Sequence, residues 1–250
     1  MMMVMFFSTS TVLLTNYLST ILKVDTTHTY SLYVWLLPGY FLGAVICFWW
    51  FRWQRWRFRF LIAGGMGCFA LFFGLLYFGV APNSTYEMLY FPIFIRGLGM
   101  LVLIIAFALF AVEDLNPKFL ISNAFFLIVF RSVLAPIMAT SFYSNVLYHL
   151  QQKYMYSLSE TLTQVDPLAA SRYSQSLVSN LSQGHRYEDA VQLATSSLYS
   201  TLQQQSLLLA LKEIFGWLFV VTLVIAVVSR FIPFHKTIRV TFAKTGDDMV

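Results

Sequence analysis

Six apolar segments, each about long enough to cross a lipid bilayer, recur along this sequence of 250 residues. Such a segment satisfies its backbone polar groups in lipid only as a helix, because the bilayer core offers no hydrogen bonds. With 58% hydrophobic and 11% charged residues, the sequence predicts an all-α integral membrane protein. We expect transmembrane helices at about 4–22, 30–51, 58–80, 88–112, 119–147 and 207–229.

The polar stretch 148–206, between the last two spans, is predicted to be helical. Asp166-Pro167 is a helix start, with an N-cap residue followed by a proline in the first turn, and Gly184 is a helix stop. Glu188-Asp189 then starts another helix, whose alanines and leucines recur at four-residue spacing. We expect this helix to continue unbroken into the span 207–229.

The positions of Lys and Arg predict the orientation of the chain. Four lie in the turn 52–59, one is Lys118 and four lie in the tail 230–250, so nine of the 16 basic residues fall on one side of a six-span protein. Basic residues accumulate on the cytoplasmic side of membrane proteins. The sequence therefore predicts that both termini are cytoplasmic and that the helical insertion 148–206 is extracytoplasmic.

Three charged residues inside the spans are candidate site residues: Arg96, Arg131 and Glu213. A charge within a hydrocarbon-length helix is costly and usually faces a protein interior or a water-filled cavity. At about 1.5 Å per residue, all three reach one layer in the outer half of the membrane. We predict a buried charge network in which Glu213 neutralises an arginine, with a purely structural ion pair as an equal alternative.

Glycines and prolines inside the spans predict close packing and kinks. Gly97 and Gly99 follow the arginine of the fourth span and allow a neighbouring helix or a ligand to approach the backbone closely. Pro38 and Gly39 in the second span, and Pro136 in the fifth, predict kinks.

The sequence offers no catalytic or metal-binding set. Its four histidines are far apart and adjacent to no cysteine, and both cysteines fall inside apolar runs, where a thiol behaves as a small hydrophobic group. The basic residues lie between apolar runs and form no stripe on a soluble face, which argues against nucleic acid as a partner. We therefore predict no enzymatic activity, no metal and no cofactor.

Four short sequences together resemble the carboxy-terminal six helices of the major facilitator superfamily. They are FIRGLGM at 94–100, Glu-Asp-Leu at 113–115, FRSVLAP at 130–136 and LKEIFGW at 211–217. The nearest branch is the fourteen-helix drug:proton antiporter type of bacterial inner membranes. The resemblance covers nearly the whole chain and implies two three-helix repeats, in which spans one and four line a cavity, two and five flank it, and three and six face lipid.

The same resemblance implies a function, the export of a small amphipathic molecule by alternating access, with protons as the coupling ion of this type. Arg131 and Glu213 match positions where such transporters also carry Arg and Glu. Asn16 and Arg96 would lie on an open cavity wall, exposed to lipid or to a partner. That partner would be a missing amino-terminal half or a second protomer. A non-transporting membrane subunit or scaffold is the alternative, and a membrane-embedded enzyme is a weaker one.

Overall fold

The computed structural model describes residues 2–23, 26–53, 58–81, 85–113, 120–161, 167–184 and 186–231. These segments are helical almost throughout and contain no strand. Residues 54–57 of the basic turn, the helix start at Asp166, the basic residue Lys118 and the tail beyond Phe231 lie outside the described residues. The fold class is therefore all-α in the described part of the chain, as the sequence predicts.

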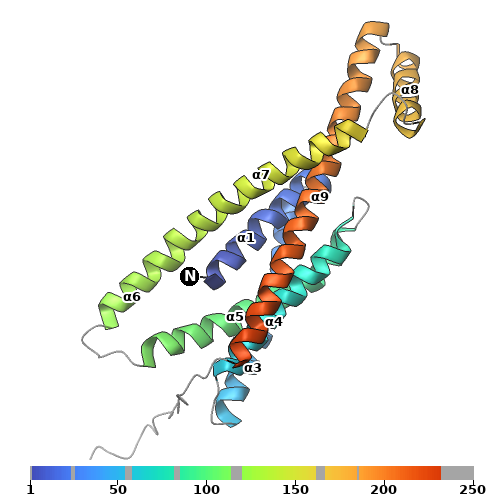
Figure 1. The fold of residues 1–250 in the computed structure, drawn as a ribbon. Coiled ribbons are helices and arrows are strands. Elements are labelled where there is room, and N and C mark those ends of the chain that lie inside the picture. Colours follow the sequence, from blue (N-terminus) through green and yellow to red (C-terminus); the bar gives the residue numbers. More distant parts are fainter. Residues whose placement is uncertain are drawn as a thin grey trace, which may run out of the picture.

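The helices follow one another along the chain with short connections (Figure 1). They are α1 (Met2–Asn16), the π turn η1 (Tyr17–Ile21), α2 (Thr26–Val34), α3 (Leu36–Trp53), α4 (Phe58–Gly79), the 3₁₀ turn η2 (Tyr86–Leu89), α5 (Tyr90–Glu113), α6 (Leu120–Val129), the π turn η4 (Phe130–Leu134), α7 (Ala135–Thr161), α8 (Pro167–Ser182) and α9 (Tyr187–Phe231).

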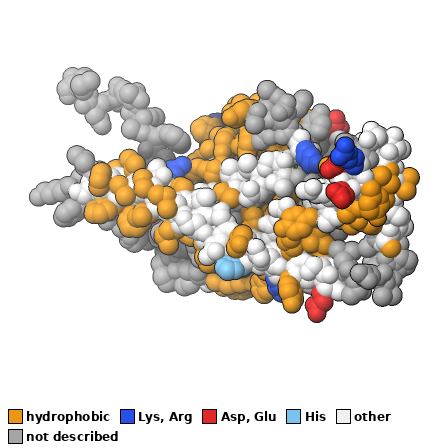
Figure 2. Space-filling view, turned by 90° about the horizontal axis from the view of Figure 1, so that it is seen from above, with side chains coloured by type: hydrophobic (Ala, Val, Ile, Leu, Met, Phe, Trp, Pro, Cys, Tyr) orange, Lys and Arg blue, Asp and Glu red, His pale blue; other side chains and the backbone are white. Residues whose placement is uncertain are grey.

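Five helical segments of the described chain are long and apolar enough to cross a membrane. They are Tyr30–Arg52, Phe60–Gly79, Glu87–Leu109, Ala124–Glu160 and Tyr187–Phe231. Each corresponds to one of the six predicted spans. The remaining predicted span, 4–22, is helical as α1 and η1 but is not among the five. The arrangement is compatible with a multi-pass membrane protein, and the space-filling view shows apolar side chains over much of the visible face (Figure 2).

The polar insertion folds into helices, as its start and stop signals predict. α8 begins at Pro167, where proline's fixed φ suits the first helical turn. Gly184 follows α8 with a φ of 87°, a conformation that a Cβ atom disfavours. After this stop, α9 runs unbroken from Tyr187 to Phe231. α8 packs beside the first part of α9, at the end of the molecule far from α3 (Figure 1).

The helix irregularities predicted at Pro38 and Pro136 both lie just upstream of the proline. The second span is divided at Trp35, and Pro38 lies in the first turn of α3, where a missing N–H leaves no helical bond unmade. Pro136 is the second residue of α7 and directly follows the π turn η4. The backbone therefore adjusts upstream of each proline, because the lost hydrogen bond and the ring affect the preceding turn.

The most extensive helix contacts are those of α4 with α9, α4 with α5 and α3 with α5. α7 also packs on α9, and α1 on α7. The centre of the core is aromatic, and its fully buried phenylalanine rings are those of Phe69, Phe72, Phe73 and Phe215. α4, α5 and α9 thus form the densest part of the bundle, on which α1, α3 and α7 lie.

Candidate functional site

Arg96 is completely buried in the second turn of α5, and α1 covers it. Its relative exposure is 0%. Nη2 donates hydrogen bonds to the carbonyl oxygen of Phe7, at 3.3 Å, and to the hydroxyl oxygen of Thr11. The guanidinium carbon also lies 4.2 Å from the centroid of the Phe7 ring, within cation–π range. One turn of α1 therefore supplies backbone, hydroxyl and aromatic contacts to this cation.

The rest of the guanidinium lacks acceptors. Nε and Nη1 are buried without a hydrogen-bond partner among the described residues. The buried hydroxyl of Tyr33 lies close to the guanidinium but outside good hydrogen-bonding geometry. Leaving such groups unpaired in a low-dielectric interior is costly. We call Arg96, Tyr33 and Thr11 the Arg96 cluster; it is rich in donors and poor in acceptors.

The expectation that Arg96 lies on an open wall is wrong. The chain itself encloses the whole side chain, because a cation that finds no water in lipid is most stable against the nearest polar and aromatic groups, here those of α1. Asn16, at the end of α1, is half-buried and its side chain makes no capping hydrogen bond.

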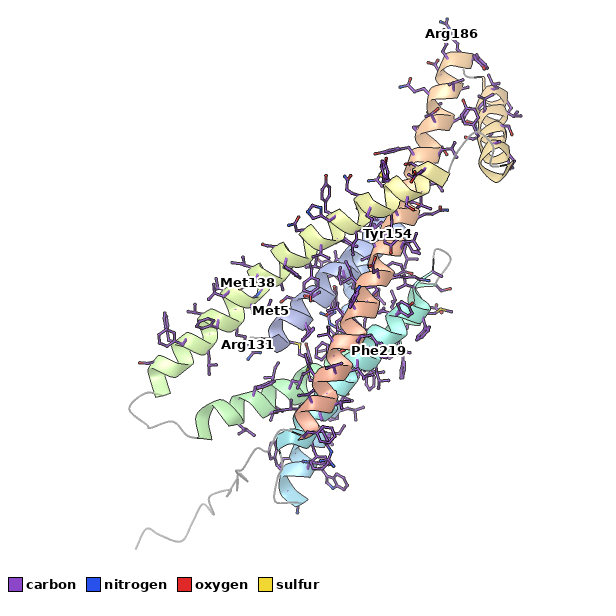
Figure 3. The ribbon with its side chains drawn as sticks, viewed as in Figure 1. Met5, Arg131, Met138, Tyr154, Arg186 and Phe219 are labelled. Atoms are coloured by element: carbon purple, nitrogen blue, oxygen red, sulfur yellow. The ribbon has the colours of Figure 1, made fainter. Side chains whose placement is uncertain are left out.

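The structure does not bring the three predicted charges together. Arg131 lies in η4 with an exposed side chain. Glu213 on α9 accepts a hydrogen bond of 2.6 Å from the Tyr154 hydroxyl of α7. Arg131 and Tyr154 lie at separate places along the α6–α7 segment (Figure 3). The predicted charge network is therefore absent from the described residues.

Arg96 and Glu213 also lie at different depths. The guanidinium carbon of Arg96 is 5.8 Å from the ring centroid of Phe72, whereas Glu213 shares a groove with Tyr77 and Phe78 in the last turn of α4. Five residues of helix separate Phe72 from Tyr77, a rise of about 7 Å. The predicted single layer rests on a last span that begins at 207, but α9 is one continuous helix from Tyr187 to Phe231, with no break at that position.

Gly97 and Gly39 permit close contact between the backbones of α5 and α3. A Cβ atom on Gly97 would lie 2.7 Å from the carbonyl oxygen of Leu36, and one on Gly39 would collide with that of Phe94. Gly99 faces α4 instead, where a Cβ atom would lie 2.7 Å from Cβ of Cys68. The predicted close approach to these glycines is therefore made by helices. Sequence could not tell which helix each glycine faces.

Comparison of the chain with protein-family models, with curated proteins and with solved structures finds no match in any of the three. Among the described residues, no group of three or more His, Cys, Asp and Glu is placed to hold a metal ion. What the fold and the site define is an all-helical chain with several apolar helices of membrane-crossing length and a buried arginine that lacks acceptors.

Proposed function

We propose that this chain is one six-helix half of a secondary transporter of the major facilitator type, which exports a small amphipathic molecule by alternating access. The observation that carries the proposal is the choice of helix partners. The six spans would be α1 with η1, α2 with α3, α4, α5, α6 with α7, and α9.

Three of the five most extensive helix pairs are consistent with two three-helix repeats. A two-fold axis between repeats exchanges span one with four, two with five and three with six. This exchange turns the pair of spans one and five into the pair of spans four and two. It leaves the pair of spans three and six unchanged. The pairs α1–α7, α3–α5 and α4–α9 belong to this set, whereas α4–α5 and α7–α9, which also pack extensively, have no counterpart of similar extent. Because three is an odd number, the second repeat would be inverted in the membrane, as in transporters of this type.

This chain has an exposed apolar surface that a second half-transporter would contact. Ala124–Glu160 is the least buried of the five candidate spans, with 11% of its most apolar window buried. Its exposed side chains include Phe125, Ile128, Ile137 and Phe142. We propose that a missing amino-terminal half or a second protomer covers part of this surface, with lipid on the rest.

The Arg96 cluster would be the polar contact for the transported molecule. Nε and Nη1 of Arg96 lack acceptors while α1 rests on α5. A state in which α1 moves away would expose these donors to an acceptor on the substrate. Alternating access supplies such a second state.

We expect the chain alone to give no transport and co-expression with a matching amino-terminal half to give it, because the site needs two opposing walls. The measurement is efflux of a fluorescent amphipathic dye from energised cells that carry both halves, compared with cells that carry either half alone. Flux by a monomeric preparation of this chain in proteoliposomes would refute the half-transporter. Absence of efflux with both halves assembled would favour a non-transporting subunit.

For topology, we expect a reporter inserted near Gln183, beside the exposed end of α8, to be extracytoplasmic and one in the turn 52–59 to be cytoplasmic. The bias of basic residues toward that turn and the tail is the reason. Paired alkaline phosphatase and fluorescent-protein fusions measure this, since each is active on one side only. Cytoplasmic signals at both positions would contradict an odd number of crossings between them.

A further inference from the structure

A groove of about 410 Å³ lies between α4 and α9 at the end of α4. Its walls include the rings of Tyr77 and Phe78 from α4 and of Trp217 from α9, and its polar side chain is Glu213. Phe78 and Trp217 are 81% and 64% exposed, so the groove opens outward from the helix pair. Neither the Arg96 cluster nor the proposed transport site includes this groove.

Two helices place the groove at the level of a membrane surface. Tyr77 and Phe78 stand in the last turn of α4, which ends at Gly79. Tyr154, the partner of Glu213, belongs to the polar stretch of α7 that carries Gln151, Gln152 and Lys153. Aromatic rings at the end of a span, with polar residues beside them, are typical of the interface where lipid headgroups lie.

Glu213 retains acceptor capacity in this groove. Tyr154 donates to Oε2, and no described residue donates to Oε1. A half-buried carboxylate among aromatic rings is best stabilised by a cation, because a cation interacts favourably both with the negative charge and with the π faces of the rings. Lys153 lies beside this tyrosine, outside the groove lining, with Nζ 5.7 Å from the Tyr154 ring centroid. An acid and a base thus contact the same tyrosine, Glu213 at its hydroxyl and Lys153 at its ring.

We propose that this groove binds a zwitterionic phospholipid through its primary ammonium group, with the ammonium at Glu213, the phosphate toward Lys153 and hydrocarbon against Phe78 and Trp217. The apolar walls favour a lipid over a small soluble amine, which has nothing to place against them. The neighbouring acid and base match a headgroup that carries both charges. A phosphatidylethanolamine fits this description.

The test is native mass spectrometry of the full chain in mild detergent with equal amounts of phosphatidylethanolamine, phosphatidylcholine and phosphatidylglycerol of matched acyl chains. The chain is expected to retain the ethanolamine lipid preferentially, and Glu213→Gln to weaken that retention about tenfold, the loss of one hydrogen bond to a charged group. Glu87→Gln, which changes an exposed acid in η2 just beyond α4, is the matched control and should keep the preference.

Equal retention of the three lipids by the parent, or an unchanged preference in Glu213→Gln, would overturn the proposal. Loss of the preference in Glu87→Gln would also overturn it, because it would reveal a general effect of surface charge. Quenching of tryptophan fluorescence by brominated ethanolamine lipid gives a second measurement that does not depend on survival in the gas phase. The part of the quenching that comes from Trp217 is the part lost in Trp217→Phe. This part should be smaller in Glu213→Gln than in the parent, and thermal melting checks that both variants fold.

Discussion

Replacing Arg96 by methionine is expected to stabilise the folded chain by about 1 to 4 kcal/mol, the range found when buried charges give way to apolar residues of similar volume. The guanidinium is fully buried with two donor nitrogens unpaired, and its favourable contacts are the hydrogen bonds of Nη2 and the cation–π contacts with the Phe7 and Phe72 rings. Methionine keeps most of the volume and packs well against aromatic rings. Thermal melting in detergent, or unfolding by titrated denaturing detergent, measures the change.

Thr11→Val is the matched control for this prediction. It removes an acceptor of Nη2 while keeping the shape of the side chain, so it should destabilise the parent by about 1 to 3 kcal/mol. In the Arg96→Met background the same change should cost much less, because no cation is left to satisfy. If Arg96→Met lowers stability instead, Nε and Nη1 of Arg96 have a hydrogen-bond acceptor in the folded chain, which contradicts the prediction. Loss of dye efflux in the assembled transporter, despite a gain in stability, would identify Arg96 as functional.

Gly39→Ala is expected to destabilise the chain by about 1 to 3 kcal/mol, or to separate α3 from α5. Its Cβ atom would collide with the carbonyl oxygen of Phe94 and lie 3.0 Å from the amide nitrogen of Leu98. Both atoms belong to backbone, which cannot turn aside as a flexible side chain can, so overpacking applies in full. Melting in detergent measures the loss, and a cysteine pair across the crossing reports separation.

Gly67→Ala provides the opposite case with the same chemical change. A Cβ atom at Gly67 meets no atom within 4 Å, so alanine should gain only its better helix propensity, up to about 1 kcal/mol. The two substitutions are thus expected to have opposite signs. Equal effects would mean that α3 and α5 do not cross at Gly39 as the structure has them.

Sequence by itself determined the elements that follow from local chemistry. Apolar length predicts the helices, and five of them are long and apolar enough to span a membrane. The start at Pro167, the stop at Gly184 and the unbroken run of α9 follow from capping preferences and residue spacing, which act within one or two turns.

Only the tertiary structure decided what each special residue contacts. Arg96 lies on Phe7 and Thr11, which are more than 80 positions away along the chain, and Glu213 lies at Tyr154, a partner that no spacing rule selects. Gly97 and Gly99 are two residues apart and face different helices. Helical periodicity fixes which side of a helix a residue occupies, but the neighbour on that side depends on how whole helices cross, and crossings are set by side chains and glycines from both helices at once.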